Sequence, residues 1–326
     1  MRFMALFVGL GLCLFLHLWL GSGMPPAAMA KTFLDFDPDD YGHYVILYQR
    51  LPRALIALHV GAVLACSGAV LQGLVRNPLA APSTLGISGG AMVFVVAGAV
   101  LGLGTAAQGI AALAGGAAGA GAAMWVARLA GLGLDPRGMV LILAGALVTM
   151  LCMGVANALL LSDPALRTAY LGWISGDINH VYADRLTQFW WIGWLAIGVL
   201  MVLAKPLTLI MLGTEKAASA GVDVRRVSLL GLGASVIAAS SATAICGPVG
   251  FVGLVVPHLV RPFTGPALWR LMPVSAVAGG LACLIADLIA REAFSPYSLH
   301  SGVVLDLAGG LVFALLIRRH YLGAQA

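Results

Sequence analysis

Residues 54–75 read ALIALHVGAVLACSGAVLQGLV, a run of 22 residues that contains no Asp, Glu, Lys or Arg. An α-helix rises about 1.5 Å per residue, so a helix of this length matches the roughly 30 Å hydrocarbon layer of a bilayer. Small residues, which let membrane helices approach one another closely, are interspersed with Leu, Ile and Val. We expect this stretch to cross a membrane as a helix.

The composition of the whole chain supports the same class. Hydrophobic residues make up 61% of the 326 residues, charged residues make up 10%, and the mean hydropathy is +0.99. A soluble domain carries about 25% charged residues. This chain is too apolar to cover a water-exposed surface, so the composition indicates an integral membrane protein.

Similar apolar runs recur along the chain and predict an all-α membrane protein of about ten transmembrane helices in a single domain, 1–326. The run at 249–260 is short, since Gly247 and Pro248 precede it and Pro257 lies within it. A span needs about 20 apolar residues. The expected spans lie near 4–23, 54–75, 84–103, 107–129, 138–161, 186–204, 227–246, 249–260, 272–290 and 302–317.

The distribution of Lys and Arg predicts the orientation, because cytoplasmic loops are enriched in both. With the N-terminus inside and ten alternating spans, 12 of the 18 basic residues lie inside and 6 outside. Both termini are then cytoplasmic. The inside set is Arg2, Arg76, Arg128, Arg137, Lys205, Lys216, Arg225, Arg226, Arg261, Arg270, Arg318 and Arg319.

The first span has an alternative interpretation as a cleaved signal peptide. Ala28-Met29-Ala30 has the A-x-A form of a cleavage site, although the preceding apolar run is longer than the usual 7–15 residues. Cleavage would leave nine spans and would not change the side of any later loop.

Several other functions are excluded or disfavoured. The net charge of +5 does not indicate nucleic-acid binding, because the basic residues are scattered and form no stripe. The five cysteines lie singly in apolar runs and are expected to be packing residues. The chain has no Gly-Lys dipeptide and so no P-loop, and it has no H-E-x-x-H. We expect no catalytic residues, no metal site and no cofactor bound by this chain.

The most polar inside segment is the expected cytoplasmic loop 205–226. Its centre, 212–222, reads LGTEKAASAGV, an Ala-rich stretch between two glycines that predicts a short helix. Such a helix is suited to docking in a groove of another protein, and an ordinary solvated connector is the alternative.

Two arginines flank a proline on the outer side, in Arg50-Leu51-Pro52-Arg53, and Arg291 also emerges there. These side chains can extend to lipid phosphates. They can also pair with carboxylates of an external partner, because Arg binds carboxylate in a bidentate manner. The residues alone favour the lipid interpretation.

The stretch 246–258, CGPVGFVGLVVPH, mixes Gly and Pro with large apolar residues. Broken helices persist in membranes only where they are buried in protein or beside a cavity. We therefore expect this stretch inside the bundle near moving parts; a merely kinked helix is the alternative. The candidate gating residues are Gly247, Pro248, Gly250, Gly253, Pro257 and His258.

Two carboxylates lie within expected spans, where charge is costly and faces a cavity or a partner. Asp287 is one turn from Arg291, which predicts an i,i+4 ion pair. Asp306 has no basic neighbour in sequence; it either lines an aqueous path or is protonated in the packed bundle. His59 and His300 are expected near the outer face, as packing residues rather than haem or metal ligands. Candidate path-lining residues are Asp306, His300 and His59.

Taken together, these segments resemble the FecCD family of permeases, whose ABC importers carry iron–siderophores, haem or vitamin B12. The resemblance covers most of the chain, and the order and spacing of its motifs make it specific. The motifs are RLPR (50–53), SGAVLQG (67–73), RNPLAAP (76–82), LAG (143–145), GWISG (172–176), GPVGFVGLVVPHLVR (247–261) and ADLIAR (286–291).

The resemblance implies ten helices per subunit with both termini inside, in the inner membrane of a bacterium or archaeon. It implies a second permease subunit, either an identical copy or a paralogue, two ATP-binding subunits that hold ATP and Mg²⁺, and an external substrate-binding protein. Membrane lipid is the other expected partner, and nucleic acid is not one. The resemblance also implies that Arg50, Arg53 and Arg291 meet acidic residues of the binding protein. The implied ATPase-coupling residues are Leu212, Gly213, Thr214, Glu215, Ala217, Ala218, Gly221 and Val222.

The last span departs from the family pattern. The family usually has Leu-Pro-[VI]-Gly before this span and Gly-x-Pro-x-Phe within it, but residues 299–302 read LHSG and residues 309–313 read GGLVF. His300 and Leu311 thus stand at the two proline positions. Asp306 stands where the family has a small or hydroxyl residue, and Thr214 where an acidic residue is common. We expect the last helix to pack or bend differently, which leaves the identity of the chelate open.

Overall fold

The computed structural model describes residues 2–26, 29–131, 138–293, 295 and 297–318. Within these residues the elements are helices and turns without any strand, which confirms the all-α prediction. Three positions used above, Ala28, Arg137 and Arg319, lie outside the described residues.

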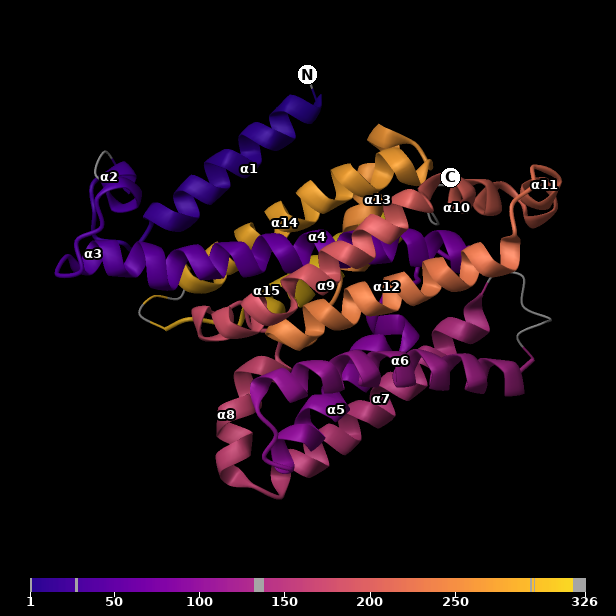
Figure 1. The fold of residues 1–326 in the computed structure, drawn as a ribbon, viewed down its shortest axis with the longest axis horizontal. Coiled ribbons are helices and arrows are strands. Elements are labelled where there is room, and N and C mark those ends of the chain that lie inside the picture. The colour runs from indigo at the N-terminus through magenta and orange to yellow at the C-terminus, as the bar shows by residue number, and fades with distance from the viewer. Residues whose placement is uncertain (1, 27–28, 132–137, 294, 296, 319–326) are drawn as a thin grey trace.

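Each of the ten expected spans overlaps one helix (Figure 1). Among the described residues, six helical stretches are long and apolar enough to cross a membrane, and α1, α5 and α15 are shorter apolar helices. The ten helices are α1 (Arg2–Trp19), α4 (Leu51–Val75), α5 (Ile87–Val100), α6 (Thr105–Leu129), α7 (Met139–Leu161), α9 (Ala183–Val202), α12 (Val224–Cys246), α13 (Val252–Thr264), α14 (Leu268–Glu292) and α15 (Ser301–Ile317).

Shorter elements connect these helices at both ends of the bundle. In Figure 1, α2, α3 and α8 lie at the left-hand end, and α10 and α11 lie at the right-hand end. The short elements are α2 (Met29–Leu34), α3 (Tyr41–Tyr44), the π-helical turn η2 (Val45–Arg50), the 3₁₀ turn η3 (Ser83–Leu85), α8 (Pro164–Ile174), the 3₁₀ turn η5 (His180–Tyr182), α10 (Ala204–Leu212) and α11 (Thr214–Ser219).

The segment expected as a loop at 205–226 is largely helical. Helix α10 occupies its first part, and Leu207 and Ile210 of α10 are buried. Helix α10 begins at Ala204, so Pro206 lies in its first turn, where the missing N–H has no partner to lose. The segment is thus a connector between spans that begins with a helix rather than an irregular loop.

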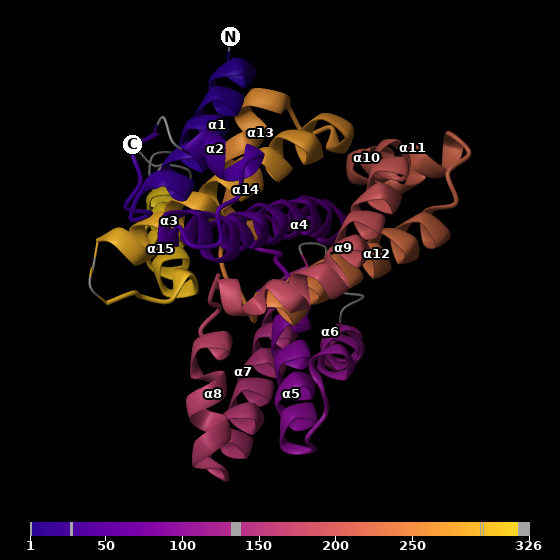
Figure 2. The ribbon, with the colours of Figure 1, turned by 60° about the vertical axis from the view of Figure 1, so that its left-hand side comes forward.

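Helix α4 lies at the centre of the molecule and packs against α9, α12, α13 and α14. Most of its residues are buried, which explains why its sequence shows no polar stripe. Helices α5, α6 and α7 pack together as a separate group, with α8 beside them (Figure 2). Helix α12 joins the two parts, because it contacts α4 as well as α5 and α6.

Glycines bring the backbones of the central helices into direct contact. A Cβ atom placed on Gly61 of α4 would collide with the backbone of Gly279 in α14, and one on Gly68 would collide with Gly253 of α13. Small residues at helix crossings allow this approach. The motif at 67–73 thus positions the start of α13.

A buried carboxylate ties four helices together. Asp287 of α14 is fully buried and accepts hydrogen bonds from Arg53 Nη2 at 2.6 Å and Arg53 Nε at 3.1 Å, both from α4. His17 Nε2 of α1 lies 2.8 Å from the same carboxylate, and Ser301 Oγ of α15 donates to it at 2.6 Å. A charge in an apolar interior is stable only when it is paired and hydrogen-bonded in this way.

This network corrects the expected pair between Asp287 and Arg291. The Nε of Arg291 instead lies 2.8 Å from Glu292, while Asp287 is occupied by Arg53 from another helix. From the sequence, only Arg291, one helical turn away, could be identified as a partner of Asp287. In the folded bundle, Arg53 of the neighbouring helix α4 binds both carboxylate oxygens instead.

A second polar contact supports the kinked helix α13. Pro257 has no N–H, so it leaves the carbonyl of Gly253, four residues earlier, without its helical donor. Gln72 Nε2 of α4 donates to the carbonyls of Gly253 at 3.3 Å and Leu254 at 3.0 Å. Its Oε1 accepts from Arg261 Nη2 at 3.1 Å. The Gln72 side chain of α4 therefore supplies the hydrogen-bond donor that the Gly253 carbonyl lacks because of Pro257.

The Asp287–Arg53 pair makes a clear prediction for stability. Replacing Asp287 with Ala leaves the Arg53 guanidinium buried without its partner, which costs about 3–5 kcal/mol. We expect a large fall in the unfolding midpoint of the purified protein, measured by thermal or denaturant unfolding in lipid nanodiscs. Asp39→Ala, which removes an exposed carboxylate, serves as the control and should change stability by less than about 0.5 kcal/mol.

A double replacement separates the ion pair from packing. Arg53→Met combined with Asp287→Leu removes both charges, and apolar replacement of a buried pair is often close to neutral. The double variant should therefore be more stable than Asp287→Ala. Equal losses in both variants would contradict the role assigned to the pair.

The Gln72 contact predicts a local effect. Gln72→Leu removes the donors to two carbonyls and should cost about 1–3 kcal/mol. Amide hydrogen exchange in Val252–Thr264 should accelerate, as measured by mass spectrometry. Gln188→Leu changes an exposed glutamine of α9 and should leave exchange in α13 unchanged. Unaltered exchange in the Gln72 variant would refute the contact.

Candidate functional site

Three motifs that are far apart in sequence meet at one place in the bundle. Gly302 N–H, at the start of α15, donates to the carbonyl of Gly176 at 2.6 Å, and Asp177 N–H donates to the carbonyl of Cys246 at 3.0 Å. Gly247 has φ +79° and packs against the carbonyl of Trp173. The segments 172–177, 246–250 and 300–306 therefore form one cluster, which we call the breakpoint cluster.

The expected gating residues lie at this cluster and in α13. Gly247, Gly253 and Pro257 are buried, and Pro248, Gly250 and His258 are partly buried. The chain leaves α12 at Cys246, turns through residues 247–251 and begins α13 at Val252. The stretch is thus a break between two helices inside protein, rather than a kink within one helix.

A pocket of about 400 Å³, lined by both polar and apolar residues, adjoins the breakpoint cluster. Asp306 of α15 is an exposed residue of its wall. The Asp306 carboxylate lies against the backbone of Gly250, where a Cβ would collide with its Oδ1. The other polar lining side chains are hydroxyls from the η3–α5 region, α7 and the end of α8: Ser83, Ser88, Thr149 and Ser175.

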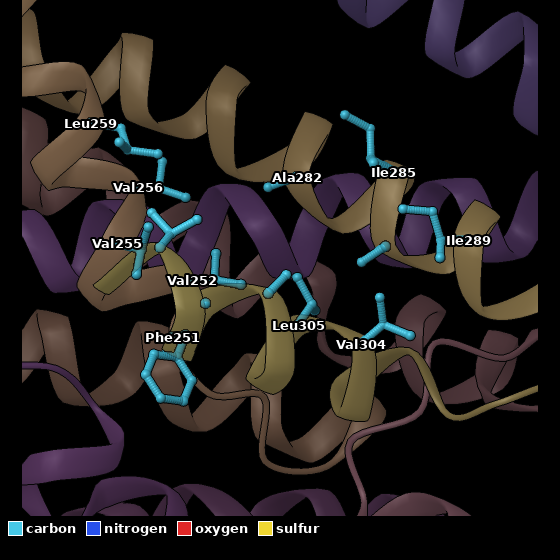
Figure 3. A pocket seen from close by; sticks show the side chains of 14 residues that line it. Phe251, Val252, Val255, Val256, Leu259, Ala282, Ile285, Ile289, Val304 and Leu305 are labelled. Atoms are coloured by element: carbon cyan, nitrogen blue, oxygen red, sulfur yellow. The ribbon is translucent and has the colours of Figure 1, made fainter. Parts of the chain in front are cut away.

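A second pocket, about 260 Å³ in volume, is apolar and lies between α13, α14 and α15 (Figure 3). Phe251 has φ +59°, a conformation that non-glycine residues rarely adopt, and it lies at the start of α13. Its ring packs against Gly309 of α15, where a Cβ would collide with it. Because Gly309 has no side chain, α15 can pack closely against Phe251, at the end of the turn between α12 and α13.

The last helix is continuous from Ser301 to Ile317, without a proline at Leu311. His300 precedes its first residue, and its Nδ1 lies 3.6 Å from Asp177 Oδ2. The His300 side chain is 40% exposed, so it lies at the rim of the cluster rather than in the packed core. Because neither residue 300 nor residue 311 is a proline, α15 is uninterrupted where it lines the 400 Å³ pocket.

His59 does not line this pocket. It is 4% exposed, and among the described residues neither of its ring nitrogens has a hydrogen-bond partner. Its ring meets Trp194 of α9 edge-on, with 6.2 Å between ring centroids. The expectation of hydrogen-bonded packing is therefore wrong for His59, because α9 covers the ring without offering it a polar partner among the described residues. Its assignment to the path stays a prediction.

The expected docking arginines all lie near the C-terminal end of α1. Arg50 Nη2 donates to the carbonyl of Gly21 at 3.1 Å, and Arg291 Nη2 donates to His17 and Leu20 carbonyls at 3.3 Å each. The last carbonyls of a helix lack intrahelical donors and attract cations. Arg53 is 7% exposed and paired with Asp287, so it presents no free guanidinium to an external protein. For Arg53 the docking expectation is contradicted.

The short helix predicted between two glycines is present as α11, Thr214–Ser219. Gly213 has φ +146° and Gly221 has φ +81°, so both ends require backbone conformations that favour glycine. Ala217 is buried and its carbonyl accepts from Val222 N–H at 3.0 Å, whereas Glu215 and Ala218 are exposed. The helix thus presents a small, exposed face at the end of the bundle opposite α2, α3 and α8 (Figure 1).

Sequence analysis missed a buried polar group between α9 and the α5–α8 part of the molecule. Arg185 of α9 is 6% exposed; it donates to Gln108 Oε1 of α6 at 2.6 Å and to the Ala244 carbonyl at 3.1 Å. Tyr170 of α8 donates to the same Gln108 oxygen at 2.8 Å. The available signal was an arginine directly before the aromatic-rich span expected at 186–204.

Comparison with known proteins shows which family this chain resembles over its length. The model of the FecCD transport family matches residues 9–319. The chain is 33% identical to the Fe(3+) dicitrate transport system permease protein FecD of Escherichia coli (strain K12), over 97% of this chain and 98% of that protein. It is 31% identical to the iron(3+)-hydroxamate import system permease protein FhuB of Bacillus subtilis (strain 168), over 96% of this chain and 83% of that protein.

A solved structure shares the fold. It is described as an inward-facing conformation of a metal-chelate type ABC transporter, and it superposes with a TM-score of 0.79 over 97% of this chain and 98% of that one, at 24% identity. The family match covers nearly all the helices described above, including the breakpoint cluster and α11. The chain therefore belongs to the FecCD transport family.

Proposed function

We propose that this chain is the membrane-spanning permease subunit of an ATP-driven importer that carries a ferric chelate inward. The observation that carries the proposal is the family match over residues 9–319, joined by relatives whose names describe permease proteins of iron systems. The chain itself has no P-loop, so ATP and Mg²⁺ belong to a separate subunit.

The complete transporter contains a second permease subunit, either a copy of this chain or a paralogue. Two ATP-binding subunits lie on the cytoplasmic side, and a substrate-binding protein docks outside. The assembly lies in the inner membrane of a bacterium or archaeon, with both termini of this chain in the cytoplasm. The excess of Lys and Arg in the segments assigned to the inside supports this orientation.

Transport proceeds by alternating access, with no chemistry on the cargo. Closure of the two ATP-binding subunits moves α11, and α10 and α12, which flank it, pass the movement to the bundle. The breakpoint cluster is where the path opens or closes, because backbone turns there replace continuous helix. ATP and the loaded binding protein must each prefer a different conformation, since a ligand shifts such an equilibrium only by differential affinity.

Reconstitution tests the proposal. The chain is purified with its cognate ATP-binding subunits and incorporated into proteoliposomes, with the binding protein and a radioactive ferric chelate on the outside face. We expect uptake that requires ATP and is insensitive to protonophores. Uptake that persists without ATP and stops with protonophores would instead establish an ion-coupled transporter.

The exposed face of α11 generates a second prediction. Ala218→Trp adds a large side chain where the isolated subunit has free space, so the fold is retained, but the added ring occupies the docking groove of the ATP-binding subunit. We expect ATP-driven uptake to fall about tenfold or more, which corresponds to about 1.4 kcal/mol. Ala165→Trp on α8, exposed at the opposite end, is the matched control. Equal uptake by both variants would rule out the coupling role of α11.

The outer arginines Arg50 and Arg291 remain candidates for docking the binding protein. Reversing each charge to Glu should weaken binding-protein affinity several-fold at low salt, because the attraction between opposite surface charges becomes repulsion. Thermal unfolding of the same variants reports the loss of the α1 contacts separately. Unchanged affinity together with lowered stability would limit both residues to capping α1.

A further inference from the structure

Asp306 lies in the part of the molecule where a charge is least expected. It is the sixth residue of α15, about 8 Å from the start of that helix at 1.5 Å per residue, and most of the neighbouring residues of α15 are apolar. Carboxylates within membrane helices face a water-filled cavity or a partner rather than lipid. Asp306 is exposed in this subunit and lines the 400 Å³ pocket, as the cavity alternative requires.

Among the described residues, none of the ion pairs includes Asp306. Its carboxylate lies against the backbone of Gly250, which carries no net charge. The remaining polar groups of the pocket are neutral hydroxyls. The Ser88 hydroxyl is buried and has no hydrogen-bond partner in the part of the chain that the structure describes.

Within the described part of the chain, the pocket wall therefore combines one unpaired carboxylate with neutral hydroxyls, and it includes no Lys, Arg or His to bind an anionic cargo. Two unit charges about 4 Å apart interact by about 1 kcal/mol in water and about 4 kcal/mol at the effective dielectric constant near a protein surface. Rings of acidic residues select cations in channels by the same physics. A chelate with several negative charges would be repelled at this point, whereas a protonated amine would be attracted.

We infer that Asp306 determines the charge class of the cargo, and that this transporter carries a ferric chelate that is neutral or positively charged rather than a polyanionic one. This inference rests on the proposed function, because it takes the pocket as part of the import path. It distinguishes this chain from its Escherichia coli relative, whose name gives Fe(3+) dicitrate as the cargo.

The test uses the complete transporter in proteoliposomes with its binding protein. Three ferric chelates serve as charge probes: ferrioxamine B as a cation, ferrichrome as a neutral chelate and ferric dicitrate as an anion. Each is compared in the wild type and in Asp306→Asn, which keeps the size of the side chain and one of its oxygens but removes the charge. Comparing the two proteins for each chelate cancels the selectivity of the binding protein.

We expect the best wild-type cargo to be the cation or the neutral chelate. Asp306→Asn should lower the ratio of cation to anion uptake about tenfold, and Asp306→Glu, which restores the charge, should recover most of it. Asp39→Asn removes an exposed carboxylate outside the pocket and should leave the ratio unaltered. Where only one chelate is delivered, its uptake rate in the three Asp306 proteins is the readout.

The experiment distinguishes a failure of the proposed function from a failure of the inference about Asp306. If no chelate enters the wild-type proteoliposomes in an ATP-dependent manner, the proposed function falls. If ATP-dependent uptake occurs but the anion is the best cargo, or if Asp306→Asn leaves uptake and its ratios within twofold of wild type, the inference alone is overturned.

Discussion

The bidentate contact between Asp287 and Arg53 is the interaction on which the arrangement of the helix ends near α2 and α3 depends. In an apolar bundle, packing alone gives little directional preference, because side chains and lipid tails are similarly hydrophobic. A buried carboxylate needs specific donors, and here they come from α1, α4 and α15. The position of one charged group thus fixes the relative placement of four helices, and it does so at the end of α1 that Arg50 and Arg291 also contact.

A related constraint governs α13, which contains Pro257 within the helix. A membrane offers no water to a carbonyl that has lost its helical donor, so the protein must supply one. Gln72 does so from α4, and it holds Arg261 with its remaining oxygen. The sequence motif around Gln72 and the motif around Pro257 are therefore two sides of one contact, although 181 residues separate Gln72 from Gly253.

The fold class and the helix positions could be predicted because both follow from local properties. Apolar length located the helix of each expected span, and the glycines and prolines at 247–257 located the short one. Interactions between distant residues could not be obtained in the same way. Arg291 was visible as a neighbour of Asp287, but Arg53, 234 residues away, was not. The burial of His59 could not be predicted either. The sequence does not show whether this side chain is exposed, and it is buried because α9 packs over it. Glu215 and Ala218 could be assigned to a short helix, since glycines with positive φ bound it on both sides.

The glycine contacts of α4 have a consequence for how the subunit can move. Where Gly61 meets Gly279 and Gly68 meets Gly253, main chain touches main chain, and no intervening side chains exist that could change rotamer to accommodate sliding. Shear between packed helices relies on such adjustments. Helices α4, α13 and α14 are therefore expected to travel as one rigid body, and the conformational cycle has to be accommodated at joints outside this unit, such as the turn that connects α12 to α13.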